Sequence, residues 1–294
     1  MELTRLGERT FVVESPVKIG VIELEGGSLL VDTGKNEDLV RKLTRSLEER
    51  GKGVTHVIVT HSHADHTGAL AFAKRRCSCS VGASPMEAAV VENPLLEPTC
   101  LWGGSPPKAL LSPFVLSKPC QVDLRLQEGK SPFDEGIEIL ELSGHSFQMI
   151  GVLSPDGVLF TADAFFPEEL IRKHGILYQA SPRKSLLALE KVRGSKARLF
   201  VPSHGQGRLE DPEPWMEATK DHIESVFCAL LEATSSWTTL EGVERELLDR
   251  FEVSETLEAL CLARSSLRGY VSDLLEEGKL QMEVRGKEVL LRRA

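Results

Sequence analysis

Short runs of hydrophobic residues, several alternating with polar ones, predict a β-rich beginning of the chain. Residues 11–13, 18–24 and 28–32 are the expected strands, and Gly26-Gly27 between the last two indicates a hairpin.

The pattern then switches between helical spacing and short apolar runs. Residues 39–50 carry apolar positions three and four apart, which predicts a helix. The β-branched run VTHVIVT over residues 54–60 predicts a buried strand, and residues 68–76 are the next expected helix. Further strands and one helix are expected after residue 120: strands at 122–126, 137–142, 150–153, 158–161 and 199–201, and a helix at 185–192.

The stretch from 93 to 119 breaks this pattern because it is rich in proline and glycine. We expect a long ordered loop with one short helix there. Loops of this length inside a compact domain are commonly lids or binding loops. Trp102 and Lys108 in this loop could cover a small substrate, and Trp102 is a candidate substrate-binding residue.

The last 84 residues are predominantly helical. Apolar faces predict helices at 221–232, 240–251 and 257–277, followed by a hairpin with strands at 280–284 and 289–291. This order has the outline of a winged helix. We therefore predict a catalytic domain over residues 1–210 and a winged-helix-like domain over residues 211–294.

Composition and charge narrow the classes of function. The chain is 41% hydrophobic, which favours a folded protein, and its 35 basic and 44 acidic residues give a net charge of −9. Residues 211–294 hold 10 basic and 18 acidic residues, a net charge of −8. Nucleic-acid binding usually depends on clustered lysine and arginine, so the acidic tail disfavours it. We expect the tail to pack against the chain or to form a homodimer.

The chain begins without a basic segment and apolar core, and no stretch approaches 18 uninterrupted apolar residues. The six cysteines form no CxxC pair. We therefore expect a cytoplasmic protein with reduced thiols and no membrane partner.

The strongest chemical signal is the segment THSHADHTG, residues 60–68. It places His61, His63, Asp65 and His66 within six positions at the end of a predicted strand. Imidazole and carboxylate groups suit a divalent metal such as zinc. Histidine is otherwise sparse, with eight in the chain, so a purely structural role for this cluster is disfavoured.

Three further side chains follow predicted strands beside small residues. His145 stands in Ser-Gly-His-Ser, Asp163 in Thr-Ala-Asp-Ala and His204 in Pro-Ser-His-Gly. Their positions at strand ends make them candidate ligands of the same centre. The remaining histidines are expected to be structural: His56, His174 and His222.

Taken in this order, the motifs HSHADH, GHS, ADA and PSHG resemble the metallo-β-lactamase superfamily, and VDTG at residues 31–34 matches a turn of that family. The resemblance covers roughly residues 10–210. It implies an α/β fold, a four-layer αββα sandwich with the metal site between the sheet edges. It also implies two divalent metal ions that share a hydroxide, the first held by His61, His63 and His145, the second by Asp65, His66 and His204, with Asp163 bridging them.

The motif residues discriminate among branches of the superfamily. His63 occupies a position where diiron flavoprotein relatives carry glutamate, so zinc hydrolysis is favoured over oxygen reduction. Asp163 stands where true β-lactamases typically have cysteine, which favours the glyoxalase II, lactonase and RNase-type branches. The C-terminal segment resembles the winged helix of a β-lactamase-like-protein-2 type subfamily rather than the glutathione-binding tail of glyoxalase II.

The favoured function is hydrolysis of a small ester, thioester or lactone by a metal-bridging hydroxide, similar to hydroxyacylglutathione hydrolase. Two alternatives stay open: a metal-dependent endoribonuclease or phosphodiesterase, and a non-heme iron dioxygenase acting on persulfides. Zinc is the favoured metal, with iron and manganese as alternatives. Asp65 would also orient the nucleophile as a catalytic residue, and Tyr178 is a candidate donor to the substrate.

Overall fold

The first of two sheets has seven strands that follow one another in sequence order. The computed structural model describes residues 1–134 and 136–294. The first four strands of this sheet are antiparallel neighbours and its last four run parallel. The strands are β1 (Leu3–Arg5), β2 (Thr10–Val13), β3 (Ile19–Leu24), β4 (Gly27–Val31), β5 (Val54–Ile58), β6 (Ser80–Ala83) and β7 (Leu124–Arg125).

The second sheet has the order β12-β11-β10-β9-β8. Strands β11 and β12 pair in parallel, and the other neighbours in this sheet pair antiparallel. Its strands are β8 (Gly129–Lys130), β9 (Glu138–Glu141), β10 (Ile150–Leu153), β11 (Val158–Ala162) and β12 (Leu199–Pro202).

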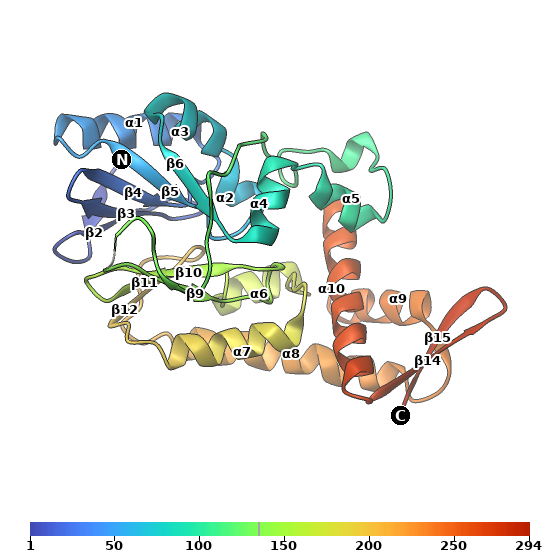
Figure 1. The fold of residues 1–294 in the computed structure, drawn as a ribbon. Coiled ribbons are helices and arrows are strands. Elements are labelled where there is room, and N and C mark those ends of the chain that lie inside the picture. The colour runs from blue at the N-terminus through green and yellow to red at the C-terminus, as the bar shows by residue number, and fades with distance from the viewer. Residues whose placement is uncertain (135) are drawn as a thin grey trace.

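The two sheets face each other, and helices cover both outer faces (Figure 1). Strand β4 shows why its sequence is an uninterrupted apolar run. Side chains alternate between the faces of a strand, so Leu29 and Val31 enter the core between the sheets while Leu30 enters the core under the helices. On the first sheet lie α1 (Glu37–Glu49) and α3 (Leu70–Cys77).

The second sheet is covered by α7 (Pro182–Arg193) and α8 (Glu213–Ala233). Shorter helices lie in the connections: α2 (Ala64–Thr67), α4 (Pro85–Glu92), α5 (Leu96–Trp102) and α6 (Glu168–His174). The resulting layers, helices, sheet, sheet, helices, confirm the predicted four-layer sandwich.

The C-terminal elements form a separate hydrophobic core. They are α9 (Leu240–Arg250), α10 (Leu257–Glu276) and a three-stranded sheet of β13 (Thr238–Thr239), β14 (Leu280–Arg285) and β15 (Glu288–Arg293). Helix α8 begins at Glu213, earlier than expected, and joins both parts. Met216 packs in the core under the second sheet, while Ile223 and Phe227 pack in the C-terminal core. The division at residue 210 stays a prediction.

The stretch from 93 to 119 contains the expected short helix, α5, and also a single 3₁₀ turn at Lys108–Leu110. Helix α10 lies beside α5 in Figure 1, and Leu101 of α5 packs in one cluster with Leu110 and Cys261 of α10. Buried contacts therefore fix this connection to the C-terminal part. In the part of the chain that the structure describes, no helix is long and apolar enough to cross a membrane.

Candidate metal centre

All seven predicted metal-binding side chains come together at one edge of the two sheets. His61 and His63 follow β5, and Asp65 and His66 lie in α2. The other three each follow a strand of the second sheet: His145 after β9, Asp163 after β11 and His204 after β12. Loops that follow buried strands, together with the short helix α2 after β5, thus supply every donor.

The donor atoms form three overlapping groups, within each of which they lie no more than 4.8 Å apart. One group is His61, His63 and His145, another is Asp65, His66 and His204, and the third is His61, His66 and Asp163. The first two groups follow the division that the sequence motifs imply.

Asp163 lies between the groups. Its Oδ1 is 3.4 Å from Nε2 of His66, and its Oδ2 is 3.5 Å from Nε2 of His145 and 3.2 Å from Nε2 of His204. Nε2 of His204 is also 3.4 Å from Oδ2 of Asp65. One carboxylate therefore contacts histidines of both groups, as a bridging ligand would.

Three atoms of the centre are buried without a hydrogen-bond partner among the described residues: Nε2 of His61, Nε2 of His66 and Oδ1 of Asp163. Burying polar atoms without partners is costly, and each such group in a folded protein calls for an explanation such as an ion. Their positions and chemistry fit divalent metal ions bound among these seven residues.

The opposite nitrogens of the histidines are held by the protein. Nδ1 of His66 lies 2.8 Å from Oδ2 of Asp32, and Nδ1 of His145 lies 3.0 Å from the carbonyl oxygen of Tyr178. Nδ1 of His204 lies 3.1 Å from the carbonyl oxygen of Pro16. Acceptors at these positions orient each ring with Nδ1 as the donor and with Nε2 toward the metal centre.

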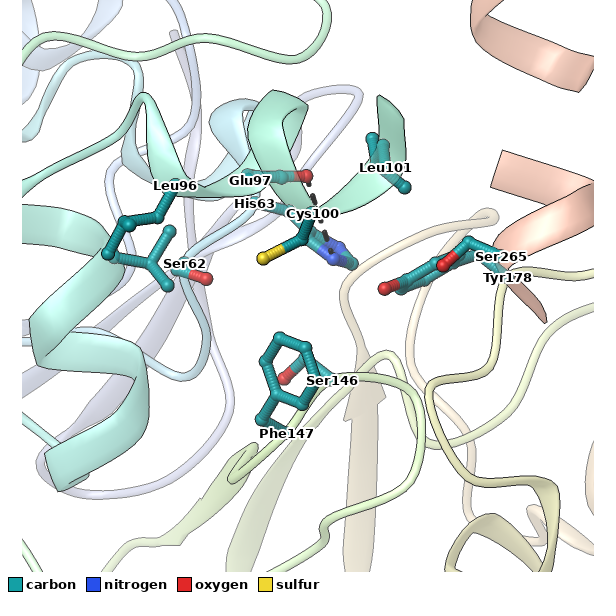
Figure 2. A pocket seen from close by; sticks show the side chains of 11 residues that line it. Ser62, His63, Leu96, Glu97, Cys100, Leu101, Ser146, Phe147, Tyr178 and Ser265 are labelled. Carbon is teal, nitrogen blue, oxygen red and sulfur yellow. Dashed lines mark ion pairs between the residues drawn. The ribbon is translucent and has the colours of Figure 1, made fainter. Parts of the chain in front are cut away.

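His63 is turned the other way. Its Nδ1 lies 3.1 Å from Nε2 of His145, and its Nε2 lies 3.9 Å from Oε1 of Glu97 on α5 (Figure 2). Glu97 is thus the outer carboxylate neighbour of His63, a residue that the sequence analysis did not identify.

The electrostatics of the centre suit metal binding. Burial lowers the pKa of His63 to about 4 and that of His145 to about 3, so both imidazoles are neutral near pH 7. Burial would favour protonation of Asp163, but the neighbouring His204 and His66 outweigh it and hold the pKa of this carboxyl well below its usual range. Burial would lower the pKa of His66 and of His204 as well, but the neighbouring Asp163 outweighs it and raises both, that of His204 to about 9. Neutral imidazoles and an ionised carboxylate are the forms that bind metals, so a metal ion at His66 and His204 would displace their protons.

Glu87 of α4 links the loops that carry the histidines. Its side chain is fully buried. Oε2 accepts a hydrogen bond from the Ser62 amide at 2.9 Å, and Oε1 accepts from the Ser146 hydroxyl at 2.7 Å and the Gln148 amide at 2.8 Å. Ser62 lies between His61 and His63, so one carboxylate fixes the loops of both sheets. A lone acid within the apolar run from 86 to 91 was the available sequence signal.

Helix α10 supports the loop that carries Tyr178. The buried Ser266 hydroxyl accepts a hydrogen bond from the Gln179 amide and donates one to the Leu177 carbonyl, both at 3.0 Å. A Cβ atom at Gly269 would stand 2.8 Å from the carbonyl oxygen of Ala180, so this close packing requires glycine. The C-terminal part therefore fixes the backbone segment whose Tyr178 carbonyl oxygen accepts the hydrogen bond from Nδ1 of His145.

A pocket opens beside His63 (Figure 2). Tyr178 lines it, with its ring centroid 5.4 Å from that of His63. Burial raises the pKa of Tyr178 well above its usual value, so its hydroxyl stays protonated.

The structure does not bring Trp102 to this pocket: its side chain is 49% exposed at the end of α5. Glu97 and Leu101, on the face of α5 toward the pocket, line it where the sequence analysis expected Trp102.

Comparison with known proteins agrees with this arrangement. The family model of the metallo-beta-lactamase superfamily matches residues 12–204. The lactamase-like protein adaB of Aspergillus niger is 25% identical over 266 residues, which cover 83% of this chain and 72% of that protein. Hydroxyacylglutathione hydrolase of Rhodopseudomonas palustris (strain BisB5) is 30% identical over 127 residues, 42% of this chain and 39% of that enzyme.

Two solved structures share the fold over nearly the whole chain. A metallo-beta-lactamase family protein from Thermus thermophilus has a TM-score of 0.72 at 20% identity, covering 97% of this chain and 98% of that one. A beta-lactamase domain protein from Burkholderia ambifaria has a TM-score of 0.69 at 16% identity, covering 100% and 94%. With its family match, fold and clustered donors, the chain belongs to the metallo-beta-lactamase superfamily and is a metallo-hydrolase that binds divalent metal.

Proposed function

We propose that the protein is a dinuclear hydrolase of a small ester, thioester or lactone, with zinc as its metal. The observation that carries the proposal is the position of Asp163. Its carboxylate contacts histidines of both donor groups, and Oδ1 has no hydrogen-bond partner in the part of the chain that the structure describes. Histidine and carboxylate donors suit zinc, and a shared carboxylate is typical of two-metal hydrolytic sites.

His61, His63 and His145 would hold one ion, Asp65, His66 and His204 the other, and Asp163 would hold both. When bound, such ions activate water and polarise a carbonyl group. The protein's own side chains then have distinct tasks. Asp65 is the most exposed of the seven, with 33% of its side chain accessible, and it lines a hollow together with Lys35.

Asp65 is therefore suited to orient an attacking water. Burial would favour its protonated form, but His66 and His204 hold its pKa well below the usual range. Its carboxylate is therefore ionised and can accept a hydrogen bond that orients the water. On the other side of the centre, the protonated Tyr178 hydroxyl can donate a hydrogen bond to the substrate oxygen as negative charge develops there.

The similarity to hydroxyacylglutathione hydrolase supports a thioester or ester substrate. The acidic C-terminal segment, with 18 acidic and 10 basic residues, argues against a nucleic-acid substrate. Dimerisation through this segment is part of the proposal and can be measured by light scattering.

The test is a panel of thioesters, lactones and single-stranded RNA, assayed with metal-loaded protein. We expect hydrolysis of a thioester or lactone and a loss of at least about 100-fold in kcat for Asp163→Asn. Cys77→Ser and Cys120→Ser, matched thiol controls, should change kcat little. Cleavage of RNA alone would replace the proposal with the nuclease alternative.

A further inference from the structure

The pocket beside His63 has walls from three parts of the chain that the metal motifs do not include. Leu96, Glu97 and Leu101 come from α5, Phe147 follows His145, and Ser265 comes from α10. Figure 2 shows these side chains around an open space, with Tyr178 and Ser265 adjacent on one side. The pocket is continuous with the centre, because His63 itself lines it.

The pocket lacks the cationic side chains that a binding site for an anionic group would normally have among its described lining residues. None of the described residues that line it is a lysine or arginine, and Glu97 is its one acidic residue. A carboxylate or phosphate of the substrate would lose its water here without gaining a cationic partner, whether Glu97 is ionised or neutral. An uncharged group meets no such cost.

The remaining surface is largely apolar but has hydrogen-bonding groups. Leu96, Leu101 and Phe147 provide apolar contact, while the hydroxyls of Tyr178 and Ser265 lie together at one side. A group that fits would be apolar along most of its length and would carry an oxygen atom toward these hydroxyls.

The walls are held in place by packing. Leu101 packs with Leu110 and with Cys261 of α10, one turn before Ser265. Helices α5 and α10 therefore form a pre-formed wall whose shape is set by buried contacts, and such pre-formed pockets select their ligands by fit.

We propose that this pocket binds the acyl side of the substrate and selects an uncharged, largely apolar acyl group. The inference rests on the proposed function, because it assigns a substrate class to the same hydrolytic site. The α5 and α10 walls, rather than the metal ligands, then determine specificity.

Two neighbouring leucines give a matched test. Leu96 lines the pocket and is 42% exposed, whereas Leu95 is 54% exposed and does not line it. Both positions tolerate arginine because both reach solvent. The substrates are p-nitrophenyl hexanoate and the p-nitrophenyl monoester of glutaric acid, which differ mainly in the terminal charge of the acyl chain.

We expect the wild-type protein to hydrolyse the neutral ester with a kcat/KM at least about tenfold higher than the anionic ester. Leu96→Arg should reduce this ratio about tenfold by supplying a cation, and Leu95→Arg should leave it unchanged. Equal or higher activity on the anionic ester in the wild type would overturn the inference, as would equal effects of the two arginines.

A binding measurement separates this inference from the proposed function. The neutral p-nitroanilide of hexanoic acid is titrated calorimetrically into the metal-loaded protein. Binding to the wild type and Leu95→Arg, but about tenfold weaker to Leu96→Arg, supports the pocket even if no ester is hydrolysed, in which case only the hydrolase proposal fails. No binding to the wild type overturns the pocket itself.

Discussion

Nδ1 of His145 lies 3.0 Å from the backbone carbonyl oxygen of Tyr178, so a loop held by the C-terminal helix orients a side chain of the metal centre. Ser266 of α10 holds this loop through its hydrogen bonds with Gln179 and Leu177. The C-terminal segment is thus structurally connected to the centre, even though all seven donors precede it in sequence.

Ser266→Ala should weaken both folding and metal binding. The substitution leaves a buried amide and a buried carbonyl without their partner, at a cost of about 1–3 kcal/mol in the free energy of unfolding. The loosened loop should also lower metal affinity. Denaturant unfolding and chelator competition measure the two effects. Ser265→Ala, one residue away, is the control, and an equal loss of metal affinity in both variants would contradict the positioning role.

Glu87→Ala should lower metal affinity by about 10- to 100-fold, the usual effect of losing an outer-shell partner. The variant loses all three hydrogen bonds that join the Ser62 loop to the Ser146 loop. Glu87→Gln keeps an oxygen acceptor on the same stem, so it should recover part of the affinity.

The zinc dissociation constant, measured with a chromophoric chelator, checks this expectation. Met86→Ala changes the preceding, exposed residue and should leave the constant unchanged. Wild-type affinity in Glu87→Ala would show that the two loops hold their positions without this carboxylate.

Low pH should destabilise the protein through His222. Burial lowers the pKa of His222 to about 4, and its Nε2 accepts a hydrogen bond from the Leu177 amide at 3.3 Å. The pKa of this histidine is about 6.5 in the unfolded chain and lower in the folded protein. Above pH 6.5 the neutral, buried imidazole therefore makes its full contribution to the free energy of unfolding. That contribution, roughly 2–3 kcal/mol, is lost as the pH falls from about 6.5 toward 4.

Unfolding by urea at pH 7 and pH 4.5, with metal removed by chelation, tests the sign. The wild type should lose about 2 kcal/mol more than His222→Gln between these pH values, because glutamine cannot take up the proton. An identical loss in both proteins would rule out His222 as the source.

The sequence predicted much of the centre because its strongest motif is local. His61, His63, Asp65 and His66 lie within six residues, and the other three donors follow strands whose apolar runs are easily recognised. That these strand ends meet at one site between the two sheets is what the resemblance to the superfamily implied, and the clustered donors agree with it.

The supporting residues could not be predicted in this way because their partners are distant in sequence. Glu87 and Ser146 are 59 residues apart, and Ser266 and Gln179 are 87 residues apart. Trp102 failed to reach the pocket for a different reason. The short helix α5 determines which side chains of this stretch face the pocket. A stretch rich in proline and glycine has no hydrophobic periodicity, so the sequence does not indicate which face of the helix points inward.

The most direct test of the account is the metal content of the protein, determined by elemental analysis after expression with balanced metals. Two groups of three donors, joined by Asp163 as the seventh, predict close to two equivalents of zinc per chain. Asp163→Asn should lower this number together with hydrolysis. One equivalent of iron without zinc in the wild type would contradict the dinuclear hydrolase and favour the dioxygenase alternative.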